Sequence, residues 1–325
     1  MRTAFGLAEF PYDLRDPVLA LGMFDGLHLG HRQVIGGAVA RARAIGGHAV
    51  VVTFEPHPLE VLLPSAEPLL LTTLDERLAS LERHGVDQVL VLPFDAEFAR
   101  MRAQVWLDEI LGGRLGAREI FAGSSYTFGY RREGTAAHLA EWGRARGIPV
   151  HLVPAVLVSG EPVSSTRIRA ALREGLVDEA ARLLGRWYTL QGQVTTGSGR
   201  GRTIGFPTAN LAWPPRKVVP ARGVYATVAE ITQNGGAGGE EGARRYGGAT
   251  NVGVRPTFGG TTLSVETHLL EFSGTLADAR MTLAFVARIR AERAFPGPDA
   301  LSHQIREDVQ RVRELLAAAG LGIIR

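Results

Sequence analysis

The sequence contains no cysteine and a single lysine among its 325 residues. The missing cysteines exclude disulfides, thiolate zinc sites, iron–sulfur clusters and cysteine nucleophiles. The one lysine, Lys217, lies in the stretch PPRKV. This position excludes a GxxxxGK phosphate loop and also a lysine-based adenylate loop of the kind found in class I tRNA synthetases. Any bound ATP must therefore be held by backbone amides, arginines, histidines or a metal ion.

Long hydrophobic runs are also missing, because no apolar stretch approaches the ~18 residues that a membrane span needs. The first residues, MRTAFGLAEFPYDLRD, lack the apolar core of a signal peptide. The apolar content of 45% and the charged content of 21% are those of a folded globular chain. We therefore expect a cytoplasmic protein with no membrane partner, and the length favours two domains.

The chain carries one stretch, LALGMFDGLHLGHRQVI over 19–35, that joins an apolar strand to a helix through a glycine turn. The first turn of a helix offers unpaired N–H groups and the positive end of the helix dipole, which together bind anions. His28 and His31 are three residues apart and share a face of that turn. The stretch predicts a site for ATP phosphates, with an ordinary strand–turn–helix as the alternative. The residues expected there are Gly22, Phe24, Asp25, His28, Gly30 and His31.

Apolar strands and amphipathic helices alternate through the first half, which predicts a parallel α/β sheet with right-handed crossovers. The expected strands cover residues 18–23, 48–54, 86–94, 118–122 and 150–158, and the expected helices between them include 72–84, 96–111 and 135–147. Pro56 and Pro58 follow the second strand and exclude a regular element there. Two more helices, 163–174 and 177–184, close this half, and we expect the domain boundary at Gly185.

The stretch VSSTRIR opens the first of these two closing helices. Its hydroxyl residues could simply cap the helix. However, Thr166 and Arg169 are three residues apart on the first turn, so they can share one phosphate. Together with the upstream histidines, Ser164, Thr166 and Arg169 form a second candidate contact for ATP.

The second half has a different texture, with short alternating strands separated by glycine and proline turns until about Pro296. Five or six such strands predict a small antiparallel barrel. Thr232–Gly248 is expected to be a flexible hairpin loop. The periodicity of 299–318 predicts an amphipathic helix, with Ile305, Val309 and Val312 on the face that caps the barrel.

Several motifs resemble one known family. FDGLHLGH, VTFEPHP and VSSTRIR are similar to the flavin adenylyltransferase module of the prokaryotic bifunctional riboflavin kinase/FAD synthetases. GRWYTLQGQVTTGSGRGRTIGFPTANL, GVYAT, NVGVRPTF, VETHLLEF and IRAERAF resemble the riboflavin kinase module. HxGH alone indicates only the nucleotidyltransferase superfamily, whereas the second set is far more specific. The resemblance implies a Rossmann-like nucleotidyltransferase domain over 1–184, followed over 185–325 by a riboflavin kinase barrel with a C-terminal helix.

The resemblance implies two reactions that use Mg²⁺ and ATP: riboflavin to FMN in the second half, and FMN to FAD with pyrophosphate release in the first. Thr208 and Asn210 follow a glycine-rich turn with Gly201 and Gly205 and offer the hard oxygens that Mg²⁺ prefers. The family uses this pair at its Mg-ATP site. Glu266 alternates with the apolar residues of its strand and corresponds to the family's base on the riboflavin 5′-hydroxyl, although a solvated carboxylate is the alternative. Arg290 and Glu292 correspond to residues near the flavin.

In the first half, the resemblance implies that His28 and His31 steady the transferring phosphate, while Ser164, Thr166 and Arg169 hold the β- and γ-phosphates of ATP. The candidate flavin contacts are Phe54, Pro58, Ser125 and Phe128. The family usually has Asp or Asn followed by Phe where Ser125 and Tyr126 stand. Smaller departures are Glu271, Ala277, Asp278 and Ala291, which fall beside the kinase motifs.

Two alternatives remain at this point. The first is a riboflavin kinase with an impaired or altered adenylyltransferase module, which the departure at Ser125 suggests. The second is a nucleic-acid-binding protein with an OB-like barrel, since residues 185–325 hold 17 Arg and Lys against 11 Asp and Glu. Such a barrel needs exposed aromatics between arginines, and its strands instead carry GFPTAN and a lone carboxylate. We therefore expect the small molecules riboflavin, FMN and ATP as partners, and no nucleic acid.

Overall fold

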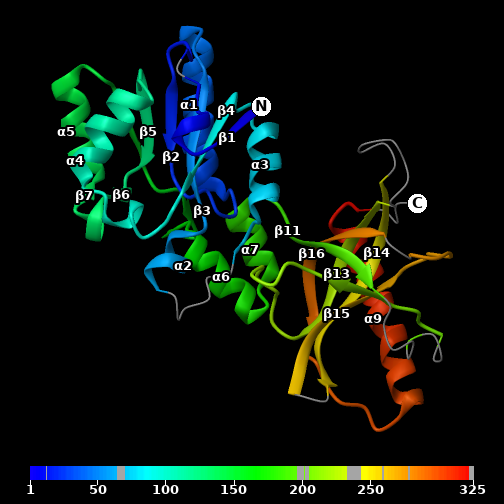
Figure 1. Ribbon diagram of the computed structural model, residues 1–325. Helices are drawn as coiled ribbons and strands as arrows, with labels where there is room; N and C mark the ends of the chain where they lie inside the picture. Colours follow the sequence, from blue (N-terminus) through cyan, green and yellow to red (C-terminus); the bar gives the residue numbers. More distant parts are fainter. Residues whose placement is uncertain are drawn as a thin grey trace. The chain divides into compact units, whose positions relative to one another are not determined.

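The computed structural model describes residues 1–11, 13–63, 70–195, 201, 205–232, 243–257, 260–276 and 279–321, with the side chains of 255–261 left aside. The chain divides into two compact units, Met1–Ser165 and Thr166–Arg325. Figure 1 draws the first from blue to green and the second from green to red. No helix in the described ranges is long and apolar enough to cross a membrane.

The first unit is built on a parallel sheet whose order reverses at its centre. The six strands lie in the order β1 (Arg2–Phe5), β4 (Gln88–Pro93), β3 (Ala49–Glu55), β2 (Val18–Leu21), β5 (Glu119–Gly123) and β8 (Val150–Val153). Every pairing in it is parallel, which confirms the predicted α/β sheet. The chain runs outward from β2 to β3 and β4 and then returns to β5 beside β2. The carboxyl ends of the strands at such a reversal are where ligands bind in open α/β sheets.

Both faces of this sheet are buried, because alternate residues of each strand point to opposite sides. Leu19 and Leu21 of β2 belong to one apolar cluster, and Val18 and Ala20 belong to the other. The helices α1 (Leu29–Ile45) and α3 (Leu74–Arg83) cover the second cluster. The π-helical segment η3 (Trp106–Arg114) and α5 (Ala136–Arg146) cover the first (Figure 1).

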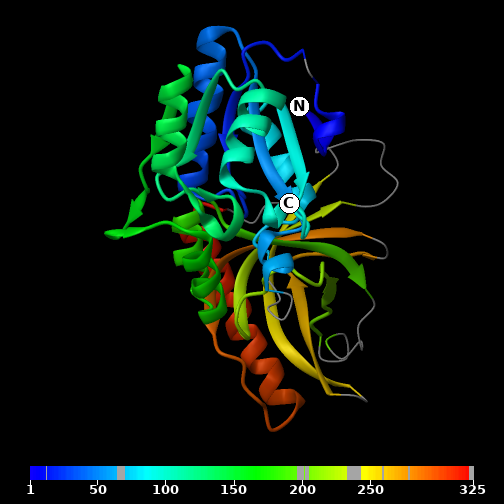
Figure 2. The same cartoon turned by 60° about the vertical axis from the view of Figure 1, so that its left-hand side comes forward.

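Three local predictions for this unit are wrong. A short helix, α2 (Pro58–Leu62), follows β3, because a proline suits the first helical position and His57 caps the turn. The predicted strand 150–158 breaks at Pro154, which cannot donate to a ladder. After the break, β9 (Leu157–Val158) and β10 (Glu161–Pro162) form a hairpin that projects from the unit (Figure 2).

The predicted helix 96–111 is interrupted. It divides into a 3-10 turn η2 (Phe98–Arg100), a short α4 (Ala103–Val105) and η3. Asp95 accepts a hydrogen bond from the Phe98 N–H (2.7 Å), and Glu133 accepts one from the Ala103 N–H (2.7 Å). Each carboxylate therefore caps a separate helical start.

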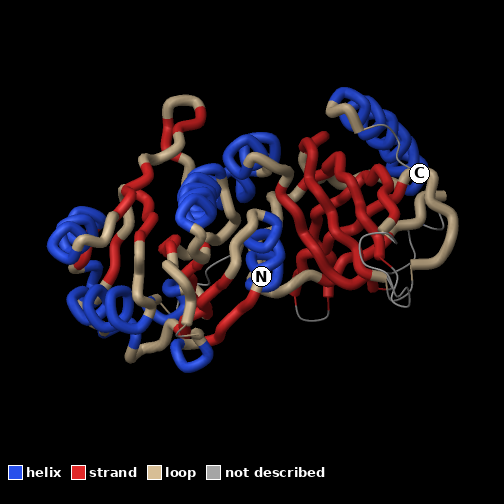
Figure 3. Tube along the Cα trace, turned by 90° about the horizontal axis from the view of Figure 1, so that it is seen from above, coloured by secondary structure: helices blue, strands red, loops and turns tan. Residues whose placement is uncertain are grey.

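The second unit is a closed antiparallel barrel, as predicted (Figure 3). Its order is β11 (Tyr188–Thr195), β12 (Ala209–Ala212), β15 (Gly260–Leu269), β14 (Arg244–Thr257), β13 (Gly223–Thr232) and β16 (Arg280–Arg290). The expected loop 232–248 is too long, because 244–248 already pair with β13. Residues 233–242 of that loop lie outside the described residues.

Helices flank the barrel on its outside. The helices α6 (Ser165–Glu174) and α7 (Val177–Leu184) precede it, and α7 contacts β11 and β16. The C-terminal helix α9 (Pro298–Ala318) runs along the outer wall, where Val309, Val312 and Leu316 are buried against Ala226 and Ala249. This packing confirms the predicted cap.

The only lysine of the chain is buried in this unit. Lys217 is 3% exposed, and its Nζ lies 5.5 Å from the centre of the Tyr188 ring. Tyr188 is itself buried and donates a hydrogen bond to the Val218 carbonyl (2.6 Å). Lys217 is therefore part of the packing of the barrel and not of a phosphate loop.

Candidate functional sites

The first candidate site is the turn between β2 and α1, at the reversal of the sheet. Phe24 and Leu27 have positive φ angles of 54° and 38°, and Gly26 between them has 84°. Side-chain-bearing residues seldom adopt this conformation, and such strain collects at functional sites. The turn is nonetheless buried, and it delivers His28 to the N-cap position of α1.

The two histidines lie face to face on the first turn of α1. Their rings are stacked with centres 3.6 Å apart, and His28 Nδ1 accepts a hydrogen bond from the His31 N–H (3.3 Å). A methyl group at Gly30 would lie 3.2 Å from His28 Cε1, so a larger residue would crowd the imidazole. The paired rings therefore stand beside the positive end of a 17-residue helix, an arrangement suited to phosphate.

Asp25 is predicted to contact ATP, but its carboxylate is engaged within the protein. The side chain is buried, and Oδ1 accepts hydrogen bonds from the Thr72 N–H (2.8 Å) and the Thr72 hydroxyl (3.0 Å). The Leu71 N–H also donates to it (3.1 Å), and Thr72 Oγ1 accepts from the Gly26 N–H (2.9 Å). Asp25 thus ties the β2–α1 turn to the segment that leads into α3.

Arg77 of α3 connects the segment after β2 to the end of β3. Its Nη1 donates to the Met23 carbonyl (2.9 Å), and its Nη2 donates to the Phe54 carbonyl (3.3 Å) and to Glu55 Oε2 (2.7 Å). The side chain is 2% exposed, and this burial lowers the pKa of the guanidinium, an effect that Glu55 opposes. Sequence reasoning missed Arg77, because its position on α3 reads as an ordinary helix residue.

The predicted flavin contacts lie at the end of β3 and in the segments that follow β3 and β5. Phe54 is on β3, Pro58 opens α2, and Phe128 ends the short strand β6 (Thr127–Phe128). Phe54 packs against Phe98 and Trp106, with ring centres 5.3 and 6.1 Å apart. Phe128 is buried and stacks on Tyr126 (5.5 Å), and desolvation raises the pKa of Tyr126. The remaining predicted contacts differ in exposure: Pro58 of α2 is half-buried, and Ser125, which lies between β5 and β6, is exposed.

The stretch VSSTRIR spans the division between the two units. Ser164 is half-buried in the first unit, where the neighbouring Ser165 hydroxyl donates to the Asp25 carbonyl (3.0 Å). Thr166 lies on the first turn of α6 and Arg169 at the start of the second, and both belong to the second unit. Their contact with the phosphates of the histidine site stays a prediction.

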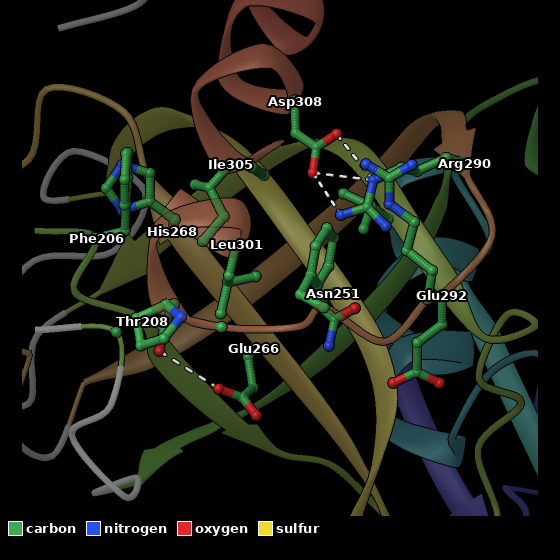
Figure 4. Close-up of a pocket in the computed structure, with 17 residues that line it drawn as sticks. Phe206, Thr208, Asn251, Glu266, His268, Arg290, Glu292, Leu301, Ile305 and Asp308 are labelled. Carbon is green, nitrogen blue, oxygen red and sulfur yellow. Dashed lines mark hydrogen bonds and ion pairs between the residues drawn. The ribbon is translucent and has the colours of Figure 1, made fainter. Parts of the chain in front are cut away.

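The second candidate site is a pocket of about 560 Å³ on the outer wall of the barrel, beside the start of α9 (Figure 4). It gathers most of the residues that the sequence predicts for the kinase reaction. Those that line it are Gly201, Thr208, Glu266, Arg290 and Glu292. Gly205 lies in the turn before Thr208 and is exposed, and Asn210 lies next to Glu266 in the sheet.

Glu266 occupies the centre of a row of polar side chains that crosses three strands. Asn210 of β12 and Asn251 of β14 are its directly opposite neighbours, so all three side chains point to the same face. Thr208 Oγ1 lies 3.5 Å from Glu266 Oε2. The adjacent Val265 and Thr267 point into the barrel and are buried, which confirms the predicted alternation.

Asn251 is a pocket residue that sequence reasoning missed. A methyl group at Gly253 would lie 2.3 Å from Glu292 Oε1 and 2.9 Å from Asn251 Nδ2, so both side chains converge over this glycine. Asn251 therefore lies between Glu266 and Glu292 (Figure 4). The stretch NVG indicates a pocket residue at Asn251 only once the register of β14 against β15 is known.

A carboxylate of α9 holds the arginine of the pocket. Arg290 Nη2 lies 2.7 Å from Asp308 Oδ2, and Arg290 Nε donates to Asp308 Oδ1 (2.9 Å). The Asp308 side chain is 4% exposed. Gln304 donates to the same carboxylate (3.0 Å), and the Arg290 and Arg293 guanidinium groups lie over the Phe295 ring, at 5.6 and 4.9 Å. The sequence could have indicated Asp308, because it is a charged residue on the apolar face of α9 and therefore needs a partner.

His268 positions the loop that carries Thr208. Its Nδ1 lies 2.9 Å from the Pro207 carbonyl oxygen, and its ring meets Phe206 edge to face at 5.3 Å. Among the family departures, Glu271 is exposed and has a positive φ of 56°. Ala277 and Asp278 lie outside the described residues.

The donors at Thr208 and Asn210 fit Mg²⁺ better than a transition metal. Over the described part of the chain, no group of three or more histidine and acidic side chains is placed to hold a metal ion. A threonine hydroxyl and an asparagine amide instead supply hard oxygens beside Glu266, and Mg²⁺ usually takes few protein ligands together with phosphate oxygens.

Comparison with known proteins identifies a family for each half of the chain. The family model for FAD synthetase matches residues 11–167, and that for riboflavin kinase matches 184–316. Bifunctional riboflavin kinase/FMN adenylyltransferases from Pseudomonas fluorescens and Bacillus subtilis are 35% and 36% identical over 318 and 299 residues. These matches cover 98% of both chains in the first case and 90% of both in the second.

A solved structure shares the whole fold. A Streptococcus pneumoniae protein described as a macrolide-efflux protein superposes with a TM-score of 0.84 and is 32% identical, over 96% of this chain and 98% of its own. The match to two consecutive family models and the near full-length relatives agree with the parallel sheet followed by a barrel. The chain belongs to the bifunctional riboflavin kinase/FMN adenylyltransferase family.

Proposed function

We propose that the barrel pocket phosphorylates riboflavin to FMN with ATP, and that the β2–α1 turn adenylylates FMN to FAD. The observation that carries this proposal is the row of Asn210, Glu266 and Asn251 in a pocket of about 560 Å³. A pocket of this size suits a small ligand. Because both reactions consume ATP, we place them in the cytoplasm.

In the kinase reaction, Glu266 accepts the proton of the riboflavin 5′-hydroxyl as this oxygen attacks the γ-phosphorus of ATP. The bond to the bridging oxygen breaks, and ADP leaves. Glu266 is half-buried in the pocket and is therefore reachable by a bound alcohol. Phosphoryl transfer depends mainly on positioning and charge stabilisation, so the residues that orient Glu266 matter as much as its basicity.

Thr208 and Asn210 are the residues that would hold Mg²⁺, with the remaining positions left to phosphate oxygens and water. When bound, the ion neutralises charge on the triphosphate. Asp308 holds Arg290 at the other end of the pocket, and Glu292 lies next to Asn251. We assign Arg290 and Glu292 to the flavin end of the pocket.

In the adenylyl reaction, a phosphate oxygen of FMN attacks the α-phosphorus of ATP, and pyrophosphate leaves. His28 and His31 stabilise the charge that develops on the transferring phosphate, together with the N–H groups of the first turn of α1. Ser164, Thr166 and Arg169 hold the leaving pyrophosphate. Phe54, Pro58, Ser125 and Phe128 form the contacts to the flavin.

The test is a chromatographic assay of flavins after incubation of the purified protein with Mg-ATP. Riboflavin should give FMN and then FAD, and FMN alone should give FAD with one pyrophosphate for each turnover. Failure to make FMN from riboflavin would contradict the kinase assignment. Accumulation of FMN without FAD would contradict the assignment of the β2–α1 turn.

A further inference from the structure

Beneath the row that carries Glu266, the interior of the barrel contains a chain of three buried threonines. Thr227 of β13, Thr250 of β14 and Thr267 of β15 are each fully buried. Thr250 Oγ1 lies 2.8 Å from Thr227 Oγ1 and 2.9 Å from Thr267 Oγ1, and the Thr227 hydroxyl donates to the Gly248 carbonyl (3.1 Å).

The direction of this chain follows from counting protons. A carbonyl can only accept, so Thr227 uses its single hydroxyl proton on Gly248. Thr227 must therefore accept from Thr250, and Thr250 must in turn accept from Thr267. The three hydroxyls point one way, from β15 through β14 to β13, and only Thr250 takes part in two hydroxyl–hydroxyl bonds.

Gly248 leaves room for the three threonine side chains, because it carries no side chain of its own. A methyl group at Gly248 would lie 2.7 Å from both Thr227 Oγ1 and Thr267 Cγ2. The neighbouring interior side chains, Val252 and Val265, are apolar and fully buried. The hydroxyls therefore depend on one another, and an unpaired buried hydroxyl is costly.

The interior chain and the exterior row alternate along the same strands. Thr250 precedes Asn251 on β14, and Thr267 follows Glu266 on β15. A slip of one residue in a strand pairing turns every side chain to the other face. Such a slip would place a threonine in the pocket and turn Glu266 into the apolar interior, and it would break the hydroxyl chain.

We propose that Thr227, Thr250 and Thr267 are positioning residues for riboflavin phosphorylation, which lock the register of β13, β14 and β15 so that Glu266 and Asn251 stay opposite each other in the pocket. This inference rests on the proposed kinase function of that pocket. The threonines touch no substrate and act through Glu266. Their effect should thus fall on turnover and leave the affinity for ATP nearly unchanged.

The test compares Thr250→Val, which keeps the shape and removes the hydroxyl, with Thr250→Ser, which keeps the hydroxyl. We expect Thr250→Val to lower kcat for FMN formation by roughly tenfold or more, with the KM for ATP within about twofold, because small misplacements of reacting groups are costly. Thr250→Ser should stay within about twofold. Thr282→Val is a control on β16. It removes a half-buried threonine hydroxyl that does not belong to the three buried threonines, and it should be neutral.

Folding and positioning are separated by the KM for ATP and by a second variant. A KM for ATP within about twofold shows that the barrel is folded, and Thr227→Val, which loses the bonds to Gly248 and Thr250 but keeps the Thr250–Thr267 bond, replaces Thr250→Val if that variant does not fold. In a Glu266→Gln background, Thr250→Val should cause little further loss, since effects exerted through one group are not additive. Full kcat in Thr250→Val and Thr227→Val, equal loss in Thr250→Ser, or additive losses with Glu266→Gln would overturn the proposal. Absence of FMN formation by the unmodified protein would instead contradict the kinase function.

Discussion

Single residues around the pocket divide into those that line it and those that hold their neighbours. Glu266 has Asn210 and Asn251 as lateral neighbours and Thr208 within 3.5 Å. The first unit shows the same two kinds of residue. His31 lies on the first turn of α1 at the candidate site, whereas Asp25 holds its neighbours, because its oxygens accept hydrogen bonds from the Leu71 and Thr72 N–H groups. We therefore expect the two reactions to depend on different single residues.

Glu266→Gln should lower kcat for riboflavin phosphorylation by about 100-fold or more and leave adenylylation nearly intact. The amide keeps the shape but cannot take a proton, and a general base typically contributes about 100-fold or more. The measurement is kcat for FMN formation from riboflavin and, separately, for FAD formation from FMN.

The reciprocal variant is His31→Ala, which should lower FAD formation and spare FMN formation. It removes one of the two stacked rings without touching the barrel. If both activities fell together in either variant, the assignment of two separate sites would be wrong.

At this scale, sequence reasoning found the residues with local signatures. The alternation around Glu266 and the spacing of His28 and His31 are visible in a few consecutive letters. Asn251 and Asp308 were missed, because their neighbours are chosen by strand register and by the packing of α9, which bring together residues far apart in the chain.

Among the elements, the ends of β2 and β3 are joined by one buried guanidinium. Arg77 reaches the Met23 and Phe54 carbonyls and Glu55. It thus couples the β2–α1 turn to the segment after β3, where Pro58 of α2 is a predicted flavin contact. No periodic pattern encodes such a link, and helix α3 was nevertheless predicted correctly.

Arg77→Met should lower the free energy of unfolding of the first unit by about 1–3 kcal/mol, because the Met23 and Phe54 carbonyls lose a charged hydrogen-bond donor. FAD formation should fall as the two strand ends loosen, while FMN formation persists. Thermal unfolding and the two assays measure this. The control is Arg83→Met on the same helix, where the side chain is exposed; an equal effect there would refute the bridging role.

A buried carboxylate also fastens α1 to the opposite end of the sheet. Glu119 at the start of β5 lies 2.7 Å from Arg41 Nη2 and 2.8 Å from His151 Nε2, and its side chain is 4% exposed. Hydrogen bonding from Arg41 lowers the pKa of Glu119 from its ordinary value of 4.5. The folded state therefore favours the ionised carboxylate.

The stabilisation that Glu119 provides depends on pH. The stabilisation from Glu119 is complete above about pH 4.5 and is lost as the pH falls through the lower pKa of the folded state. Glu119→Gln should cost about 1–3 kcal/mol at pH 7, and the difference from the unmodified protein should shrink at acidic pH. Melting temperatures measured between pH 3 and pH 7 test this; a difference that grows on acidification would contradict it.

At the scale of the whole molecule, the order of a parallel α/β sheet and an antiparallel barrel was predictable, because the periodicity of the sequence changes between them. The position of the boundary between the two domains is less sharply defined. The compact units divide at Ser165, whereas the predicted boundary is Gly185 and the kinase family model begins at residue 184. The helices α6 and α7 lie between these positions.

Two fragments test the boundary. On α7, Val177, Ala180, Leu183 and Leu184 are fully buried, and the helix contacts β11 and β16. A fragment of residues 166–325 should therefore be more stable than one of 185–325 by about 3 kcal/mol or more, at about 1.5–3 kcal/mol for each large apolar side chain. Urea unfolding of both measures the difference, and equal stability would support a boundary at Gly185.

The burial of Lys217 against Tyr188 makes the lysine amine a chemical probe of barrel opening. An acylating reagent meets a single side-chain amine in this chain, and that amine is 3% exposed. Its labelling therefore requires the barrel to open, and the labelling rate measures how often that happens. Ligands that occupy the pocket should slow labelling in proportion to their affinity, so the stability of one half can be followed while the other half remains at work.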